Sequence, residues 1–494
     1  MKHGKYKHGK HKGHKFKGHK YKGYKGKGFK KMGKKMKKMF NRILKMDLVA
    51  AASTGDLRLV RRAISGGCDL NALNDEVGSA LMGAAKGNHV EVMTLLLVSG
   101  ANVDLRRGDG CSALHLAVAS QHSRAAKLFL DFDADASLAN TDGVTPVLLA
   151  VENGLLNLIK LLLKAAPQSL RAVSKDGANV LAIAAQAGQV EVVDMLLTCK
   201  VPVDLKCGKG RTPLMFAAAS GQVEVLKLLL EKGAAPNTTA IDGNTALTIA
   251  AEAGKVQAVR TLLSHGARTN PSEFPEVAPL AAAAQNGHVE VIQVLLQNSA
   301  DVDAHDGDWD SALHEAVYSG QVEAARALVE ASPGANVNKR NRSGWTPLMG
   351  AAHRDFVQIM ELLVWKGASV MLKTKDGRTA LHIAAEEGHT EATRFLLGRG
   401  ASVDAVDRLK RTPLMLAAYR GHKDTVQLLL DNDASLARTD YMNQNPLEVA
   451  LSNSKIDVAT LLVYSEPRFR NKRKQASKSS SPRVKRQHAA HVSP

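Results

Sequence analysis

Residues 301–310 hold a dense group of carboxylates, with five Asp in ten positions. Oxygen ligands at this density can bind calcium, but a calcium loop carries carboxylates at its first, third and fifth positions and Gly at its sixth, and Gly307 stands one place late. Two other interpretations stay open. The run can face the basic segment 339–342, or Trp309 with Asp306 and Asp308 can anchor a basic peptide of a partner protein.

Short basic segments recur along the chain and can bind acidic groups. As scattered surface charge they need no further explanation, and as partner contacts they are candidate binding residues. The candidates in these segments are Arg106, Arg107, Lys206, Lys209, Arg211, Arg340, Arg342, Arg408 and Lys410.

The first thirty residues form six pentads with Lys at the second and fifth place of each. Repelling charge of this density predicts a disordered segment over 1–30. Interleaved aromatic rings beside the charge favour RNA or DNA binding, while an anionic lipid surface, an acidic protein, nuclear import and weak metal binding by five His remain alternatives. The candidate residues for an anionic partner are Lys5, Tyr6, Lys7, Lys15, Phe16, Lys17, Lys20 and Tyr21.

Two more terminal segments are basic. Residues 31–45 place Met, Phe, Ile and Leu on one face of a predicted helix and Lys on the other, which fits an N-terminal cap of the following domain or a helix that binds a membrane surface or a calmodulin-like groove. Residues 467–494 are Ser-rich and predicted to be disordered, and Arg473 and Lys474 lie in a basic run that resembles a nuclear address or a nucleic-acid patch.

The net charge of +20 over 494 residues belongs to these ends. Residues 1–45 carry nineteen Lys and Arg, residues 467–494 carry nine, and neither segment has an acid, whereas residues 46–466 hold 39 bases against all 47 acids. Four Cys without a CxxC pair favour a reducing compartment. With no secretory apolar segment and no run of eighteen apolar residues, we expect an intracellular protein, cytoplasmic or nuclear, without signal peptide or transmembrane segment.

The middle of the chain repeats itself about every 33 residues. Thirteen positions align at this spacing, here called anchors; eleven of them are Ser, Thr or Asn, and Ala follows five positions later in every repeat. The anchors are Met46, Ser79, Ser112, Thr145, Asn179, Thr212, Thr245, Ala278, Ser311, Thr346, Thr379, Thr412 and Asn445. Such a period indicates a solenoid whose units bury their apolar faces against their neighbours.

Each unit predicts a pair of helices. Eleven anchors are Ser, Thr or Asn, which cap helix N-termini, and Pro often follows at the first helical position. Nine residues after the anchor, Gly in nine units and Asn88 in another suit a left-handed end to the first helix, whereas Gln121, Asp355 and Ser454 suit it less well. A second helix follows, for example over residues 223–230.

Segments such as Asp376-Gly-Arg-Thr-Ala-Leu-His-Ile-Ala-Ala-Glu-Glu-Gly-His389 resemble the ankyrin repeat. The resemblance covers about residues 40–465 and implies an all-α helical-repeat solenoid over 46–466, with about thirteen repeats and short inter-repeat β-hairpins. It also implies a concave face, formed by hairpin tips and first helices, that binds other proteins. His115, His314 and His382 match family positions that hydrogen-bond within the repeat, as do His288, His389 and His422.

The sequence therefore predicts a non-enzymatic scaffold, without cofactor or small-molecule substrate, that binds one or more proteins and is localised by basic tails. A monomer is expected. The alternative is a binder of nucleic acid or anionic membrane surfaces whose N-terminal tail is the active part, and this binding would weaken steeply with salt. A third hypothesis is that a basic tail folds back on the acidic middle and blocks its binding face.

Overall fold

The computed structural model describes residues 48–270, 277–305 and 308–465. The predicted segments 1–30, 31–45 and 467–494 lie outside these residues, and so do Met46 and Asp306. The chain divides into two compact units, residues 1–108 and 109–494, and each is described by itself.

The described part of the first unit is made of short helices. Residues 48–54 are helical, followed by α2 (Leu57–Ser65), α3 (Ala80–Lys86) and α4 (Val90–Val98). Ser79 caps α3, because its hydroxyl accepts a hydrogen bond of 3.2 Å from the backbone N–H of Met82. The predicted pair of helices is therefore present after this anchor.

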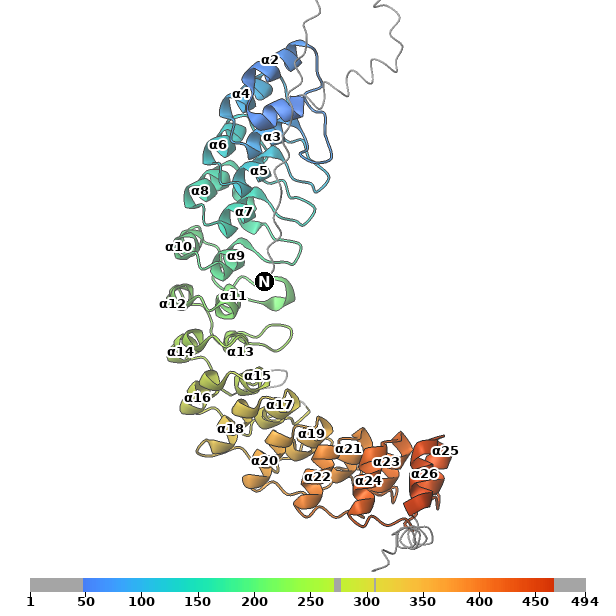
Figure 1. Ribbon diagram of the computed structural model, residues 1–494. Coiled ribbons are helices and arrows are strands. Elements are labelled where there is room, and N and C mark those ends of the chain that lie inside the picture. Colours follow the sequence, from blue (N-terminus) through green and yellow to red (C-terminus); the bar gives the residue numbers. More distant parts are fainter. Residues whose placement is uncertain (1–47, 271–276, 306–307, 466–494) are drawn as a thin grey trace, which may run out of the picture. The chain divides into compact units, whose positions relative to one another are not determined.

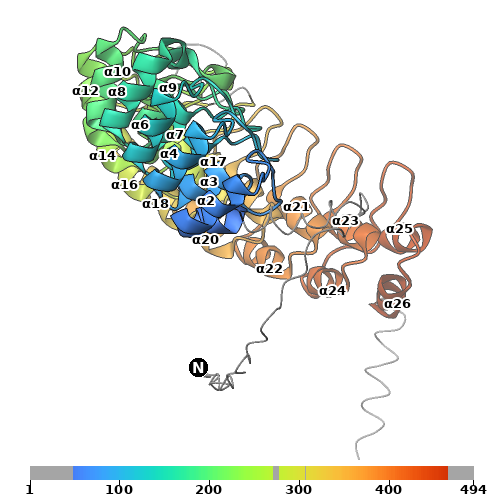
Figure 2. The same cartoon turned by 90° about the horizontal axis from the view of Figure 1, so that it is seen from above.

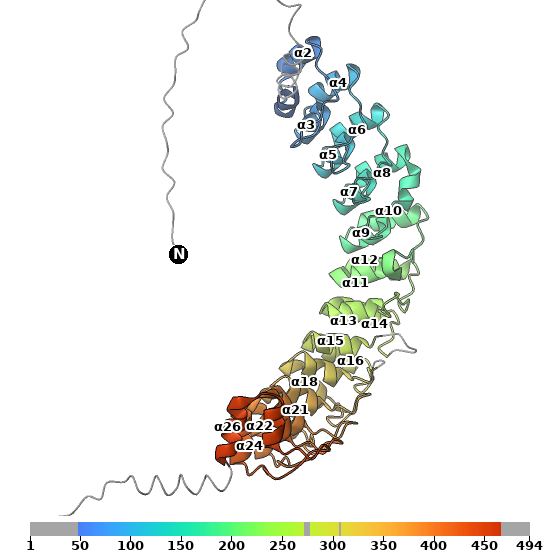
Figure 3. The same cartoon turned by 90° about the vertical axis from the view of Figure 1, so that its right-hand side faces the viewer.

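The second unit continues with helix pairs. Its first helices are α5 (Ala113–Ala119), α7 (Pro146–Glu152), α9 (Val180–Gln186), α11 (Pro213–Ser220), α13 (Ala246–Glu252), α15 (Pro279–Gln285), α17 (Ala312–Tyr318), α19 (Pro347–His353), α21 (Ala380–Glu387), α23 (Pro413–Arg420) and α25 (Pro446–Ser452). Its second helices are α6 (Ser123–Asp131), α8 (Leu156–Ala165), α10 (Val190–Thr198), α12 (Val223–Glu231), α14 (Val256–Ser264), α16 (Val289–Gln297), α18 (Val322–Glu330), α20 (Val357–Trp365), α22 (Thr390–Gly398), α24 (Lys423–Asp431) and α26 (Ile456–Ser465). Figures 1 and 3 show the first helices in one row and the second helices in another.

The helix boundaries follow the capping residues of the sequence. All twelve anchors from Ser79 to Asn445 stand at the N-cap of a first helix, as predicted. Gly388 ends α21 with φ +79°. Gln121, Asp355 and Ser454 also have φ between 57° and 60°, so the left-handed turn is kept even where its residue is less suited to it.

The constant Ala explains how closely the first helices pack. The Ala five residues after the anchor is buried in all thirteen repeats, from Ala51, 4% exposed, to Ala450, 0% exposed. Successive first helices of the second unit contact one another, and so do successive second helices from α10 to α26. A larger side chain at this register would force the helices apart, since protein cores have no spare volume.

The loops between repeats differ in detail from the implied β-hairpins. No residue in the described ranges lies in a β-strand, and the loops hold three isolated antiparallel bridges, Asn74–Gly78, Val173–Asn179 and His305–Ser311. The chain turns into the next helix after one or two backbone pairs, which is too short for a strand ladder. In Figure 2 these loops project to one side of α21, α23 and α25.

Backbone hydrogen bonds join the tips of neighbouring loops in the second unit. The N–H of Arg342 donates to the carbonyl oxygen of Asp308 at 2.9 Å, and that of Lys375 to Ser343 at 3.1 Å. In the next two tips the N–H of Arg408 donates to Asp376 at 2.9 Å and that of Tyr441 to Leu409 at 3.0 Å. We call this series the tip ladder. It holds each tip in a fixed register against the next.

Within the described ranges, every helix is too short or too polar to cross a bilayer.

Candidate partner-binding face

Four apolar side chains lie half-buried on consecutive first helices of the second unit. They occupy the same register, four residues after the anchor, and are Leu116, Leu149, Ile183 and Phe216. Because α5, α7, α9 and α11 contact one another in turn, these side chains form a continuous row, which we call the apolar stripe. It gives the first-helix side of the predicted binding face an apolar surface that is partly open to solvent.

Further along the same unit the first-helix side becomes polar. The Tyr318 hydroxyl lies 3.3 Å from an Asp310 carboxylate oxygen, which also accepts a 3.0 Å hydrogen bond from the Asn341 amide. Burial, with the nearby carboxylate of Asp310, raises the pKa of Tyr318 well above its usual value. The hydroxyl therefore stays protonated and donates to Asp310.

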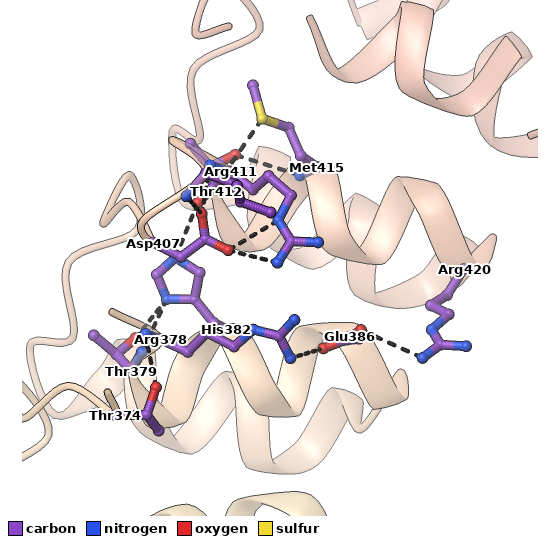
Figure 4. A network of polar contacts seen from close by, with 11 residues as sticks. Thr374, Arg378, Thr379, His382, Glu386, Asp407, Arg411, Thr412, Met415 and Arg420 are labelled. Atoms are coloured by element: carbon purple, nitrogen blue, oxygen red, sulfur yellow. Dashed lines mark hydrogen bonds and ion pairs between the residues drawn. The ribbon is translucent and has the colours of Figure 1, made fainter. Parts of the chain in front are cut away.

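An acidic side chain on α21 connects two repeats. Glu386, whose side chain is 12% exposed, pairs with Arg378 at 2.7 Å and with Arg420 of the following repeat at 3.3 Å. Figure 4 shows Glu386 between the two guanidinium groups. A carboxylate shared by two arginines fixes their positions on this face more firmly than a single exposed pair does.

The neighbouring tip is held by a second ion pair. The Asp407 side chain, 1% exposed, accepts from Arg411 Nε at 2.9 Å and Nη2 at 2.8 Å. Its other oxygen accepts from the backbone N–H groups of Leu409 and Arg411 at 2.9 and 2.8 Å. Asp407 thereby closes the loop that presents Arg408 and Lys410.

The repeated histidines are structural, and their contacts extend beyond their own repeat. His115, His314 and His382 accept at Nδ1 from the anchor of their own repeat and donate from Nε2 to a carbonyl oxygen of the next repeat, at 3.1 to 3.2 Å. His288, His389 and His422 reach back instead, to carbonyl oxygens of the preceding repeat. The implied hydrogen bond within the repeat is present in the first group alone.

Burial lowers the pKa of His382 from its usual value to about 4, although the Arg411 carbonyl acts in the opposite sense. The hydrogen bonds agree with a neutral ring, because two donors of Thr379 already point at Nδ1. At neutral pH this histidine carries no charge on the face.

The described residues of the acidic run, 301–305 and 308–310, contact the rest of the array. Asp303 accepts from the backbone N–H of Asn336 at 3.0 Å, and Lys339 Nζ donates to the Asp303 carbonyl oxygen. Trp309 is 55% exposed and stacks beside His305 with ring centroids 5.4 Å apart. Among the residues described, no three His, Cys, Asp or Glu side chains gather as a metal site.

The predicted basic residues fall into two groups. Arg211 pairs with Asp242 at 3.3 Å, and Arg340 donates to the carbonyl oxygen of Lys373, so both take part in contacts between repeats. Burial would raise the pKa of Asp242, but hydrogen bonds from Asn244 and Arg211 outweigh it and lower the pKa. The other basic candidates are exposed, except Arg107, which is half-buried; they are Arg106, Lys206, Lys209, Arg342, Arg408 and Lys410. The acidic candidate Asp308 is exposed as well.

Two exposed residues were missed in the sequence, one at a tip and one at the end of a second helix, away from the first-helix face. Lys375 stands at the same tip register as Arg342 and Arg408 and is exposed. Comparing the residue four before each anchor would have found it. Trp365 ends α20, is 71% exposed and lies under the ammonium group of Lys366, 4.5 Å from the ring centroid. Its register, nineteen residues after the anchor, is polar in most other repeats, as at Asp131, Glu231 and Asp431, and this pattern indicates an exposed position.

The chain is similar to known proteins in its repeats. A family model described as ankyrin repeats in three copies matches residues 48–140, 124–207, 182–273, 272–341, 313–407 and 400–473. The Caenorhabditis elegans ankyrin repeat and KH domain-containing protein mask-1 is 51% identical over 59 residues, which are 12% of this chain and 2% of that protein's length. The crystal structure of the human ASB11 ankyrin repeat domain is 29% identical and covers 45% of this chain and 98% of that one, with a TM-score of 0.41. Since the family model matches most of the sequence in the same segments that fold into capped helix pairs, the chain belongs to the ankyrin repeat family.

Proposed function

We propose that this chain is a non-enzymatic scaffold that binds one or more partner proteins along the first helices and tips of its second unit. Ankyrin repeats are in general protein-interaction modules, and the recurring polar residues have structural roles as caps and links between repeats. The observation that carries the proposal is the apolar stripe, four half-buried apolar side chains in one row, followed further along the same unit by polar and charged groups. A row of this kind gives a partner apolar area to bury, and the polar surroundings give specificity.

The basic segments 1–30, 31–45 and 467–494 are proposed to localise the scaffold. Their charge suits anionic surfaces, including RNA, DNA and lipid headgroups. The alternative function, in which the N-terminal tail itself is the binding element for nucleic acid or membrane, is supported by its aromatic residues among lysines, such as Tyr6, Phe16 and Tyr21.

Capture from nuclease-treated lysate at physiological salt tests the scaffold. The full chain is compared with a variant in which Leu149, Ile183 and Phe216 are changed to Gln, and bound proteins are quantified by mass spectrometry. Specific partners should be lost from this variant. The matched control changes Trp365 and Ile456 to Gln, two exposed residues on second helices, and should retain the partners.

Both variants must keep the helix content and unfolding midpoint of the parent chain, so that lost capture reports the surface. If the stripe variant captures the same proteins as the parent, the first-helix face is not the binding surface. Capture that is seen in untreated lysate and disappears with nuclease or with added salt would favour the tail alternative.

A further inference from the structure

Three exposed cations stand at one register of three consecutive tips. Arg342, Lys375 and Arg408 each lie four residues before an anchor, and the tip ladder holds them in line through the bonds of Arg342 N–H to Asp308, Lys375 N–H to Ser343 and Arg408 N–H to Asp376. We propose that this row binds an extended acidic segment of a partner protein. The inference rests on the proposed scaffold function and names the chemistry of one of its partners.

The structure separates these cations from others nearby. Lys339, Arg340 and Lys373 donate to backbone carbonyl oxygens of neighbouring repeats, and Arg378 and Arg411 pair with Glu386 and Asp407. By contrast, within the described part of the chain, the side chains of Arg342, Lys375 and Arg408 form no ion pair. The side chains of Arg342, Lys375 and Arg408 can therefore turn toward a ligand, whereas contacts within the fold hold the others in place, two of them in ion pairs.

The tips cannot take up a partner strand. The N–H groups of Arg342, Lys375, Arg408 and Tyr441 are all used in the tip ladder. Because strand addition needs unpaired backbone groups at an edge, a ligand here has to be recognised by side chains. This favours charge and spacing as the basis of selectivity.

The spacing fits one backbone conformation of the ligand. Neighbouring repeats are roughly 10 Å apart, the diameter of one helix. A polyproline II segment advances about 9.3 Å in three residues and returns to the same side, whereas a β-strand places residues three apart on opposite sides. We therefore expect carboxylates at every third residue of an extended, PPII-like ligand.

One end of the row is apolar. Leu409 is 42% exposed, Tyr441 59% and Met442 60%, and the tip ladder joins Tyr441 to Leu409 at 3.0 Å. In a ligand whose third carboxylate contacts Arg408, the side chain three residues further along lies against Leu409, Tyr441 and Met442. An apolar residue at that position would complete the match.

Asp376 is the acidic exception in this row. It follows Lys375 directly, is exposed, and would repel an acidic ligand. Its neutralisation in an Asp376→Asn variant should tighten binding, by about twofold for an exposed charge.

The test uses the full chain and two blocked decapeptides of equal composition. One has three Glu-Pro-Ser triplets followed by Leu, and the other has its three Glu adjacent. The readouts are fluorescence anisotropy and the NMR shift of the Met442 methyl group, which reports this site separately from the basic tails. The triplet peptide should bind several-fold more tightly than the peptide with adjacent Glu and should shift the Met442 methyl signal. The variant R342A/K375A/R408A should bind the triplet peptide about tenfold more weakly and should no longer discriminate between the two peptides.

The matched control is K206A/K209A, which removes two exposed cations from another tip and should leave discrimination unchanged. Equal binding of the two peptides, or discrimination that survives in the triple variant, would overturn the proposal. Tighter binding of a ten-nucleotide deoxythymidine strand through the same three cations would overturn it too, in favour of nucleic acid. If the triple variant still captures the stripe-dependent partners from lysate, the scaffold function stands without the acidic ligand.

Discussion

The imidazole Nε2 of His382 lies 3.1 Å from the carbonyl oxygen of Arg411, 29 residues further along the chain, and links α21 to the loop before α23. The same ring accepts at Nδ1 from the backbone N–H and the hydroxyl of Thr379. One neutral side chain therefore caps its own helix and fixes the next repeat (Figure 4).

Stability should fall in mild acid because of His382. Its pKa is about 4 in the folded chain against about 6.5 when unfolded, so the unfolded chain binds the extra proton between these values. The contribution of neutral His382 to the free energy of unfolding is fully present above pH 6.5 and is lost as the pH falls toward 4. At pH 5 the free energy of unfolding should be lower by roughly 2 kcal/mol. Urea unfolding at pH 7 and pH 5 measures it.

The control for that experiment comes from the chain itself. Thr248 stands in the corresponding position of its repeat and donates from its hydroxyl to the Val277 carbonyl at 3.0 Å. A His382→Thr variant should keep the link and lose most of this pH dependence. An unchanged pH dependence would show that His382 is not the group responsible.

Gly388→Ala should destabilise the array by about 2 kcal/mol or more. The φ of +79° disfavours any side chain, and an added Cβ would come within 2.4 Å of His422 Nδ1. Gly400→Ala, at φ +85° with nothing within 4 Å of its Cβ, separates the two causes and should cost about 1 kcal/mol. Thermal or urea unfolding of both variants measures the two losses of stability. Equal losses in the two variants would mean that contact with His422 is unimportant.

Asp407→Ala should loosen the loop that presents Arg408. The variant leaves Arg411 unpaired and removes the acceptor of two backbone N–H groups, at a cost of about 2 to 3 kcal/mol. Amide hydrogen exchange of residues 407–411 should rise. Asp376→Ala in the preceding tip removes an exposed carboxylate and should change exchange little, so a similar rise in both variants would contradict this role of Asp407.

Deletion of residues 1–30 should separate the two proposed binding modes. It removes twelve lysines, so capture that depends steeply on salt and is lost after nuclease treatment should disappear. Partners that depend on Leu149 and Ile183 should remain. Their affinity should rise if the tail blocks the face and stay constant if it does not, as measured by titration of a purified partner.

Most of the fold could be predicted from local patterns. The anchors gave the helix starts because capping is a local interaction between a side chain and the next three residues. The left-handed ends at Gln121, Asp355 and Ser454 were harder to foresee, because the packing of the second helix imposes a conformation that these residues do not prefer. β-Hairpins were expected between the repeats, but the described loops form turns and single bridges, because the next helix begins before a strand ladder can form.

The candidate surface was less predictable. Arg340 and Arg342 are two positions apart and have similar neighbours in the sequence. The Arg342 side chain is open to a ligand, whereas the Arg340 side chain donates to the carbonyl oxygen of Lys373. This difference depends on where the next repeat places a carbonyl oxygen, which a linear pattern does not contain.

The tip ladder has a modular consequence. Each linked tip gives one carbonyl oxygen to the repeat after it and one N–H to the repeat before it, as Leu409 and Arg408 do within a single loop. A whole repeat can therefore be duplicated or excised in frame, and the flanking donors and acceptors will meet again. A surface built in this way changes length in whole units, and with each unit a single ligand-facing position is gained or lost.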